Sequence, residues 1–273
     1  MMYHYCSMNN FFKIINSRKL FLFNANSMND SLETNWILHL IDEEISKRKD
    51  IITDSDINLL RNSFRINRIY PYISCFSKNG DSLSQWRAYA DDGKGIAIGF
   101  DQEKLRINNN IPSNTAVVKD SIGYFDCIYD IDIQKELINQ NLDKICELIK
   151  QKNNTEMYFI DIAHSFNKLS LVFKNPCFNE EKECRIIHNP MVMGNKENDT
   201  IILAGISDID FIVKGKNISS YFKFDLDDIF NSELIPVIIL GPKNEMNLIE
   251  LETYLSVKKL NNTLIKVSKA SYR

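Results

Sequence analysis

The strongest constraint on the fold of this chain is an apolar stripe that runs between Thr155 and Lys174. Its members recur every three or four residues, the spacing that gathers side chains on one face of an α-helix. They are Phe159, Ile162, Phe166, Leu169 and Phe173. The stripe therefore predicts a helix that packs against a core. Pro176 ends the predicted helix, because the residue before a proline avoids the α region.

Three more segments show the same helical spacing. They lie near residues 33–49, 54–64 and 133–150. No internal repeat or low-complexity tract interrupts the sequence. We therefore predict a single domain, residues 1–273, that carries helical insertions at about residues 33–66 and 130–174.

Short apolar or alternating runs between the helices predict strands. They cover residues 3–6, 20–23, 69–77, 95–100, 115–119, 122–127, 181–188, 200–203, 210–213, 221–224, 234–240 and 264–267. Residues 24–31 favour a loop, and residues 81–91 favour a short helix. Strands and helices mix without a regular βαβ rhythm. The sequence therefore predicts an α+β fold with a central mixed or split β-sheet and flanking helices.

The charge and the cysteine content argue against some classes of function. A formal net charge of -3 provides no global basic field for nucleic acid or an anionic membrane. No secretory signal is visible and no stretch approaches the ~20 apolar residues of a spanning helix, so we expect a cytoplasmic protein without a membrane partner. The six cysteines form no C-x-x-C pair and the four histidines form no ligand pair. No metal site is predicted.

Two serines in the strand at residues 69–77 are candidates for a ligand site. Alternation directs Ser74 and Phe76 to one face of the sheet, and Cys75 and Ser77 to the other. One serine can therefore face a cleft. Ser77 taken alone also fits a plain strand end that begins the following turn.

Aromatic residues provide a second set of candidates. Trp86 and Tyr89 lie three residues apart in the short helix, on adjacent turns, where two rings could sandwich a flat ligand ring. They fit equally well as residues that pack the helix against the sheet, because tryptophan is usually buried. His4, between Tyr3 and Tyr5, also fits a histidine that simply packs within a sheet.

Charged residues cluster in the strand that follows the long helices. Alternation aligns Glu181, Glu183 and Arg185 on one face of that strand. Two carboxylates and a guanidinium on one face suit either a binding cleft or a solvated sheet edge. Glu180 and Lys182 also fit the short E-x-K pattern of some metal-dependent nucleases.

Several motifs along the chain are shared with one family. They are Tyr3-His4-Tyr5, Asn29-Asp30 with Glu33, Ser74–Ser77, Gln85–Ala90, Gly95–Phe100, Glu181-x-Glu183-x-Arg185 and Gly241-Pro242. Through these motifs, almost from end to end, the chain resembles the bacterial family catalogued as domain of unknown function 2971 (DUF2971). The resemblance implies kinship without a particular reaction, because that family carries no established activity.

The order of three motifs is also similar to that of ADP-ribosyltransferases. These enzymes have an opening strand with histidine, a central strand with serines and a late Glu-x-Glu strand. The similarity implies a split-sheet cleft that takes NAD as a substrate. His4 would contact the adenosine ribose, and Ser74 or Ser77 would support the nicotinamide-side ribose. The serines here are separated by one residue more than in the Ser-x-Ser motif of those enzymes.

The same similarity implies roles for the aromatic and charged candidates. Tyr89 or Trp86 would stack on nicotinamide, although here the ring comes from a helix. Glu183 would be the catalytic carboxylate, which stabilises oxocarbenium charge as in glycoside hydrolysis. Glu181 would position an acceptor, or would be spare in a glycohydrolase. Arg185 would hold Glu183 ionised by charge pairing.

Three functions follow as expectations. The first is an NAD-processing or ADP-ribosyltransferase-like enzyme of a stress, toxin or antiphage defence system, which acts on a small-molecule nucleotide with a protein or nucleic-acid acceptor. The second is a regulatory module that binds a nucleotide without turnover. The third is a metal-dependent nuclease that uses Glu180 and Lys182. The oligomeric state stays open.

Overall fold

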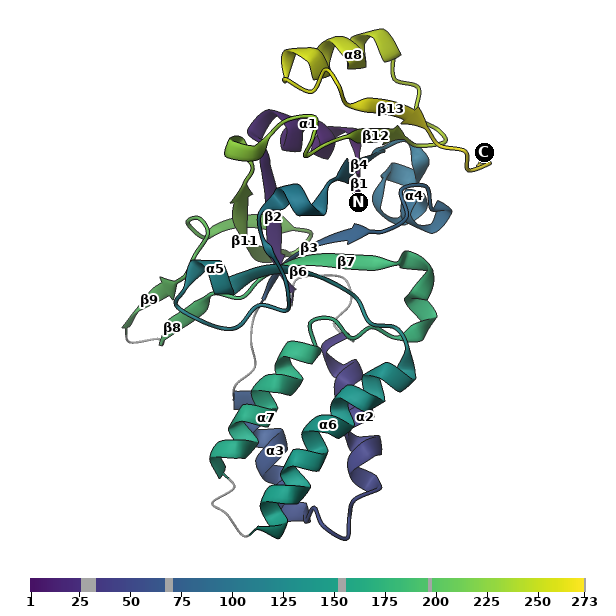
Figure 1. Ribbon diagram of the computed structural model, residues 1–273. Coiled ribbons are helices and arrows are strands. Elements are labelled where there is room, and N and C mark those ends of the chain that lie inside the picture. Colours follow the sequence, from purple (N-terminus) through teal and green to yellow (C-terminus); the bar gives the residue numbers. More distant parts are fainter. Residues whose placement is uncertain (26–32, 67–70, 152–155, 196–197, 273) are drawn as a thin grey trace.

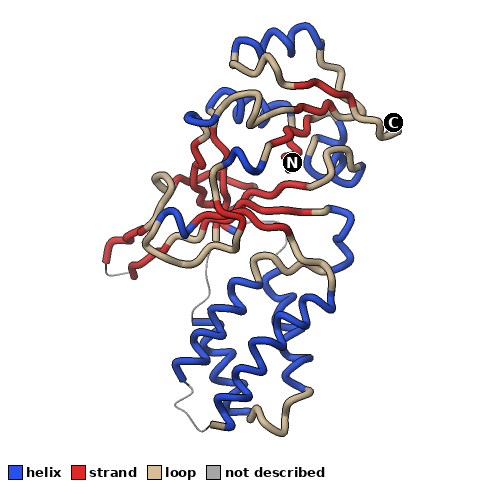
Figure 2. The backbone as a smooth tube through the Cα atoms, viewed as in Figure 1, coloured by secondary structure: helices blue, strands red, loops and turns tan. Residues whose placement is uncertain are grey.

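The computed structural model of the protein describes residues 1–25, 33–66, 71–151, 156–195 and 198–272. It has an α+β fold with a mixed central sheet, as the sequence predicts (Figure 1). Strands cross the middle of the molecule, and long helices gather on one side of them (Figure 2). The predicted loop around Asn29 and Asp30 lies outside the described residues.

One large sheet forms the centre of the fold. Its strands are β1 Met2–Cys6, β2 Lys19–Asn24, β3 Tyr72–Ser77, β4 Ile96–Phe100, β5 Asn108–Asn109, β6 Ile122–Asp126, β7 Glu183–His188, β10 Asp210–Lys214, β11 Asn217–Asp225, β12 Val237–Leu240 and β13 Leu264–Val267. The main path follows the order β10-β11-β2-β3-β1-β4-β12-β13. Strands β7, β6 and β5 extend the sheet from β3. Strands β8 (Met191–Asn195) and β9 (Asn198–Leu203) form a separate hairpin.

The sheet splits at β3. Along one edge, β3 pairs antiparallel with β7 from Tyr72 to Ser77. Along the other edge, β2 pairs with the start of β3, where Phe23 lies opposite Ile73. Strand β1 instead pairs with the end of β3, where Tyr3 lies opposite Ser77. Strands β1 and β2 therefore diverge on either side of the middle of β3.

Helix α1, Met8–Ser17, joins the two diverging strands. Ser7 caps its first turn, because the serine hydroxyl accepts a hydrogen bond from the backbone N–H of Asn10 at 3.4 Å. The apolar face of the helix, which includes Ile15, is buried in the main core of the sheet. Arg18 ends the helix in the left-handed conformation, with a φ of 52°, and turns the chain into β2.

The two predicted helical insertions pack together as one bundle. Its helices are α2 Glu33–Ser46, α3 Asp54–Ile66, α6 Ile131–Lys150 and α7 Glu156–Leu169. Figure 2 shows them side by side on one side of the sheet. They share an apolar core that contains Ile37, Leu60, Ile138 and Phe166. Among the helices in the described ranges, none is both long enough and apolar enough to cross a membrane.

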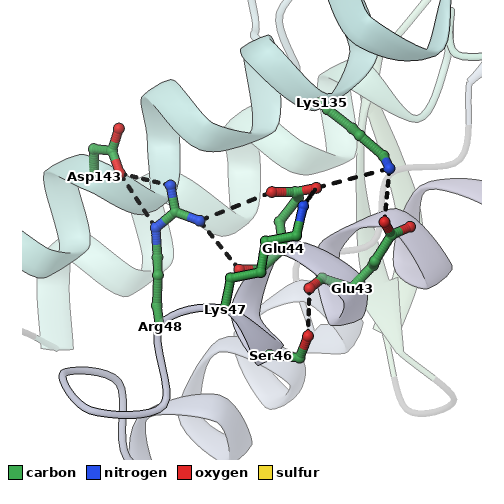
Figure 3. A network of polar contacts seen from close by, with 7 residues as sticks. All are labelled: Glu43, Glu44, Ser46, Lys47, Arg48, Lys135 and Asp143. Atoms are coloured by element: carbon green, nitrogen blue, oxygen red, sulfur yellow. Dashed lines mark hydrogen bonds and ion pairs between the residues drawn. The ribbon is translucent and has the colours of Figure 1, made fainter.

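Ion pairs join α2 to α6 at the surface of this bundle (Figure 3). This bundle network consists of Glu43, Glu44, Lys47, Arg48, Lys135 and Asp143. Glu44 is buried, with only 2% of its side chain exposed, and its Oε1 lies 2.6 Å from Lys47 Nζ. Arg48 Nη2 lies 2.8 Å from Asp143 Oδ1, and so links the end of α2 to α6. The network therefore connects the first helical insertion to the second.

The end of α7 and the segment at residues 115–119 differ from the sequence prediction. Helix α7 ends at Leu169 instead of Lys174. The segment after it is not helical because its backbone pairs with Ile128, whose N–H donates to the Val172 carbonyl at 2.8 Å and whose carbonyl accepts from the Lys174 N–H at 3.1 Å. The strand predicted at residues 115–119 is instead a loop that leads into the short helix α5, Val118–Ser121.

The beginning of β7 also differs from the prediction. Glu181 is the last residue of a 3₁₀ helix, Pro176–Glu181, and does not belong to the strand. Lys182 follows in the left-handed conformation, with a φ of 43°, so the extended strand starts only at Glu183. Simple alternation therefore does not place Glu181 relative to Glu183. Strand β8 was not predicted.

Candidate functional site

A cavity of about 690 Å³ lies where β1 and β2 diverge from β3. Its walls come from these strands, α1, β7, the short helix α4 (Leu83–Tyr89) and the chain between α7 and β7. Six of the eight residues predicted for a site line the cavity. They are His4, Ser74, Tyr89, Glu181, Glu183 and Arg185. A volume of this size is typical of small-molecule sites.

The cavity reaches both faces of the sheet. Residues paired across two strands share a face, so Cys75 lies on the same face as Arg185, and Ser77 on the same face as Glu183. Ser74 points to the opposite face, because successive residues of a strand alternate. Ser74, Cys75, Glu183 and Arg185 all line the cavity. A ligand that fills it therefore passes through the split in the sheet.

Two cations and two carboxylates form a buried ion-pair cluster at one end of the cavity. This cavity quartet consists of Lys174, Glu181, Glu183 and Arg185. The Lys174 ammonium donates to the carboxylates of both glutamates. Arg185 Nε donates to Glu183 Oε1 at 2.7 Å, and its Nη2 donates to Oε2 at 3.2 Å. Arg185 Nη1 also donates to the Leu171 carbonyl at 2.8 Å, which ties the quartet to the turn after α7.

The quartet holds Glu183 ionised. Burial by itself would raise the pKa of the Glu183 carboxyl. The charges of Arg185 and Lys174, with hydrogen bonds from Arg185 and the Cys75 thiol, outweigh burial and lower that pKa to about 2. Glu183 is therefore a fixed negative charge near neutral pH, and is poorly suited to carry protons.

His4 presents a neutral imidazole to the cavity. Its Nδ1 lies 3.1 Å from the backbone oxygen of Cys75. Because a carbonyl oxygen only accepts hydrogen bonds, Nδ1 carries the proton, and Nε2 of the neutral ring is an acceptor. Burial lowers the pKa of His4, although the hydrogen bond to Cys75 opposes this effect. The ring can therefore accept a hydrogen bond from a ligand hydroxyl.

Tyr89 forms an aromatic wall of the cavity. Its side chain is 51% exposed. Partial burial, together with the negative charge of Glu181, raises the pKa of the Tyr89 hydroxyl to about 12. The phenol therefore stays protonated, and its exposed ring is available for contact with a ligand.

The structure does not bring Ser77 and Trp86 to the cavity wall. The Ser77 hydroxyl donates to the Glu181 carbonyl at 2.7 Å and accepts from the backbone N–H of Asn79 at 3.1 Å. Trp86 is fully buried, and its ring meets that of Tyr5 edge-on with centroids 4.7 Å apart. Both residues therefore support the site indirectly. The Ser77 hydroxyl and the Trp86 N–H already form hydrogen bonds within the protein, and the Trp86 ring packs against Tyr5.

The cavity is also lined by polar residues that the sequence did not single out, among them Lys174, Gln85 and Cys75. Lys174 had been predicted as the end of a long helix, so its bonds to the glutamates could not be foreseen. Gln85 and Cys75 belong to the motifs that carry the family resemblance, which was the available signal for them.

The nuclease expectation rests on Glu180 and Lys182. Neither residue lines the cavity. Across the part of the chain that the structure describes, no group of three or more His, Cys, Asp or Glu side chains is placed to hold a metal ion.

The start of helix α4, which carries Tyr89, is held by the segment that follows the last strand, β13. Asp81, just before the helix, accepts a hydrogen bond from Trp86 Nε1 at 2.7 Å. The same carboxylate accepts from the Ser268 hydroxyl at 2.5 Å and from the backbone N–H of Lys269 at 2.7 Å. These bonds connect the cavity wall to the segment that follows β13.

Fold and site together define an α+β protein with a split sheet and an ionised carboxylate in a cavity through the split. Residues 85–186 of this chain match the model of the family described as "Protein of unknown function (DUF2971)". The match confirms the resemblance over the segment that contains Tyr89 and the cavity quartet, whereas His4 and Ser74 lie before it. Comparison with curated proteins and with solved structures gave no match.

Proposed function

We propose that the protein binds NAD, or a closely related dinucleotide, in this cavity and cleaves the nicotinamide–ribose bond. The observation that carries the proposal is the convergence of His4 from β1, Ser74 from β3 and Glu183 from β7 on one cavity. The similarity to ADP-ribosyltransferases implies three such strands around a split. A cytoplasmic location is part of the proposal, because NAD is abundant there.

The carboxylate of Glu183 supplies the main chemical effect. When the bond breaks, the electron pair leaves with the nicotinamide nitrogen and positive charge develops on the ribose ring. A fixed carboxylate that is ionised beforehand stabilises this charge. Water then adds to the anomeric carbon and loses a proton, which gives ADP-ribose and nicotinamide. In a transferase, a nucleophile of a protein or nucleic-acid acceptor replaces that water.

Other cavity residues take the supporting roles. The acceptor Nε2 of His4 and the hydroxyl of Ser74 suit the ribose hydroxyls of the dinucleotide. Among the described residues, the Ser74 hydroxyl has no hydrogen-bond partner, so it is available to a ligand. The exposed ring of Tyr89 suits contact with the nicotinamide ring. Glu181, at the edge of the quartet, is the residue that would position an acceptor.

Incubation of the purified protein with NAD tests the proposal. We expect release of nicotinamide, measured by chromatography, and a decrease in its rate of about 100-fold or more in Glu183→Gln, because the stabilising charge is lost. The matched control is Glu44→Gln, which removes a buried, ion-paired glutamate that does not line the cavity and should leave the rate unchanged. If the wild-type protein neither binds NAD nor releases nicotinamide, the proposal fails.

Glu183→Gln also leaves two buried cations with fewer partners, so its folding must be checked by thermal unfolding. Tyr89→Ala gives an independent test, because the ring is half exposed and its loss should not unfold the protein. We expect this variant to bind NAD more weakly while its melting temperature stays near that of the wild type. Unchanged NAD affinity in Tyr89→Ala would contradict the assigned position of the nicotinamide ring.

One observation favours a second candidate function, binding of the dinucleotide without turnover. Both oxygens of Glu183 already accept hydrogen bonds from Arg185, and one also accepts from Lys174. A carboxylate so fully occupied has less negative charge to offer to a reacting ribose. Saturable binding of NAD by calorimetry, with no nicotinamide released over many hours, would assign the protein to this class.

A further inference from the structure

A buried glutamine faces the cavity without a partner. Gln85 lies on α4, is only 7% exposed and lines the cavity. Within the described ranges, no hydrogen bond is made by its side-chain amide. The Gln85 side chain is buried as a whole, but neither its Oε1 nor its Nε2 is enclosed, and both open onto the cavity. An amide that opens onto a cavity and has no partner in the protein is available to form a hydrogen bond with a ligand there.

Gln134 is a buried glutamine with a structural role, and it provides a comparison for Gln85. It is fully buried, and its Nε2 donates to the carbonyls of Ile128 and Lys174 at 2.5 and 2.8 Å. Its Oε1 accepts from Trp36 Nε1 at 2.9 Å. Both ends of that amide are therefore used inside the protein. The contrast indicates that Gln85 does not hold the fold together.

The surroundings of Gln85 define the chemistry of its ligand. Tyr89 lies four residues further along α4, and therefore on the same side of the helix, where its half-exposed ring also lines the cavity. A glutamine amide presents one acceptor and one donor side by side. The complementary group is flat and also has one donor and one acceptor side by side. A carboxamide on an aromatic ring meets this requirement and provides a ring for Tyr89 to contact.

We propose that Gln85 and Tyr89 form a subsite that recognises the carboxamide of a nicotinamide ring. This inference rests on the proposed function and adds the group that selects the substrate. The carboxamide N–H donates to Gln85 Oε1, while Gln85 Nε2 donates to the carboxamide oxygen. A nicotinic-acid ring carries a carboxylate instead, which has no donor for Oε1 and brings a negative charge towards Glu181 and Glu183. The subsite therefore selects NAD over nicotinic acid adenine dinucleotide.

Calorimetric titration of the wild type and of Gln85→Met with both dinucleotides tests the subsite. Methionine keeps the length of the side chain and removes both hydrogen-bonding atoms. We expect the wild type to bind NAD about tenfold more tightly than the nicotinic-acid form, and the variant to bind the two within about twofold of each other. Gln140→Met, at an exposed position on α6, is the matched control and should keep the wild-type preference.

Thermal unfolding separates recognition from a structural role. Gln85→Met should melt near the wild-type temperature because it removes no hydrogen bond within the protein, whereas Gln134→Met removes three and should melt lower. Equal wild-type affinity for the two dinucleotides would overturn the subsite and leave the proposed function standing. An unchanged preference in Gln85→Met would overturn the role of Gln85. Failure of the wild type to bind either dinucleotide would overturn both proposals.

Discussion

The bundle and the cavity each contain a buried glutamate in an ion-pair network, but the two networks differ in their contact with water. Glu44 in the bundle is 2% exposed, yet Lys47 and Arg48, its cationic neighbours, are 54% and 18% exposed (Figure 3). Glu183 in the cavity is 8% exposed, and its partners Lys174 and Arg185 are only 6% and 4% exposed.

The difference indicates what each network can do. Cations that reach solvent regain hydration when a partner is lost, so such a network contributes modest stability and little else. Cations that are buried with their carboxylates cannot regain it, and burying them carries a large desolvation penalty. The protein keeps such an arrangement beside the cavity, where it fixes an ionised carboxylate in the cavity wall.

The largest expected effect compares the same substitution in the two networks. Glu183→Gln should lower the free energy of unfolding by about 3–5 kcal/mol, because two buried cations lose a charged partner. Glu44→Gln should lower it by only about 1 kcal/mol, because Lys47 can turn towards water. Urea denaturation of both variants measures the difference. Equal losses would show that burial of the cations does not distinguish the networks.

Lowering the pH should reduce the stability that the cavity quartet gives to the wild-type protein. The pKa of Glu183 falls from 4.5 to about 2 on folding, so its contribution is fully present above about pH 4.5 and is lost as the pH falls towards 2. The loss should amount to about 3 kcal/mol of unfolding free energy across that range. Urea denaturation at a series of pH values should show this slope in the wild type and a shallower one in Glu183→Gln. Parallel slopes would contradict the low pKa.

Of the two networks, salt should weaken the bundle network and leave the cavity quartet unchanged. Sodium chloride at about 1 M shortens the screening length to about 3 Å and weakens exposed pairs such as Arg48 with Asp143. We expect a loss below about 1 kcal/mol, which should shrink in Arg48→Met because that pair is already gone. A salt-induced change in the Glu183 slope with pH would argue that the quartet is open to water.

The smallest expected effect on stability concerns Ser74. In the described part of the chain its hydroxyl has no hydrogen-bond partner, so Ser74→Ala should change the free energy of unfolding by less than about 0.5 kcal/mol. NAD affinity should nevertheless fall, because the hydroxyl is assigned to the ligand. A stability loss without any change in affinity would reverse that assignment.

The sequence predicted the elements whose signals are local. The apolar stripe placed α7, and alternation placed Ser74 and Cys75 on opposite faces of β3, as the strand register shows. The predicted end of α7 was wrong because the backbone of residues 172–174 pairs with Ile128, far away in the chain. The bonds from Lys174 to Glu183 then depend on that pairing. No local pattern carries such information.

The residues of the candidate site also fall into those that the sequence predicted and those that it could not predict. Residues in recognisable motifs, such as His4 and Glu183, were predicted and line the cavity. Trp86 was predicted with them, but sequence spacing does not tell which side of a short helix faces the sheet, and Trp86 faces it. The partnerless amide of Gln85 is a property of its surroundings, which no spacing in the sequence reveals.

The position of β1 between β3 and β4 has a consequence for how the protein folds. Met2 pairs with Phe100 and Tyr3 with Ser77, so the central strand makes its ladder with partners far along the chain. Contacts of such high sequence separation slow folding, because loop entropy is lost before they form. Strands β10 and β11 are neighbours in the chain, so their hairpin forms without closing a long loop. We expect refolding in two kinetic phases, with local hairpins and helices first, and ligand-binding competence appearing only in the slow phase, when β1 docks.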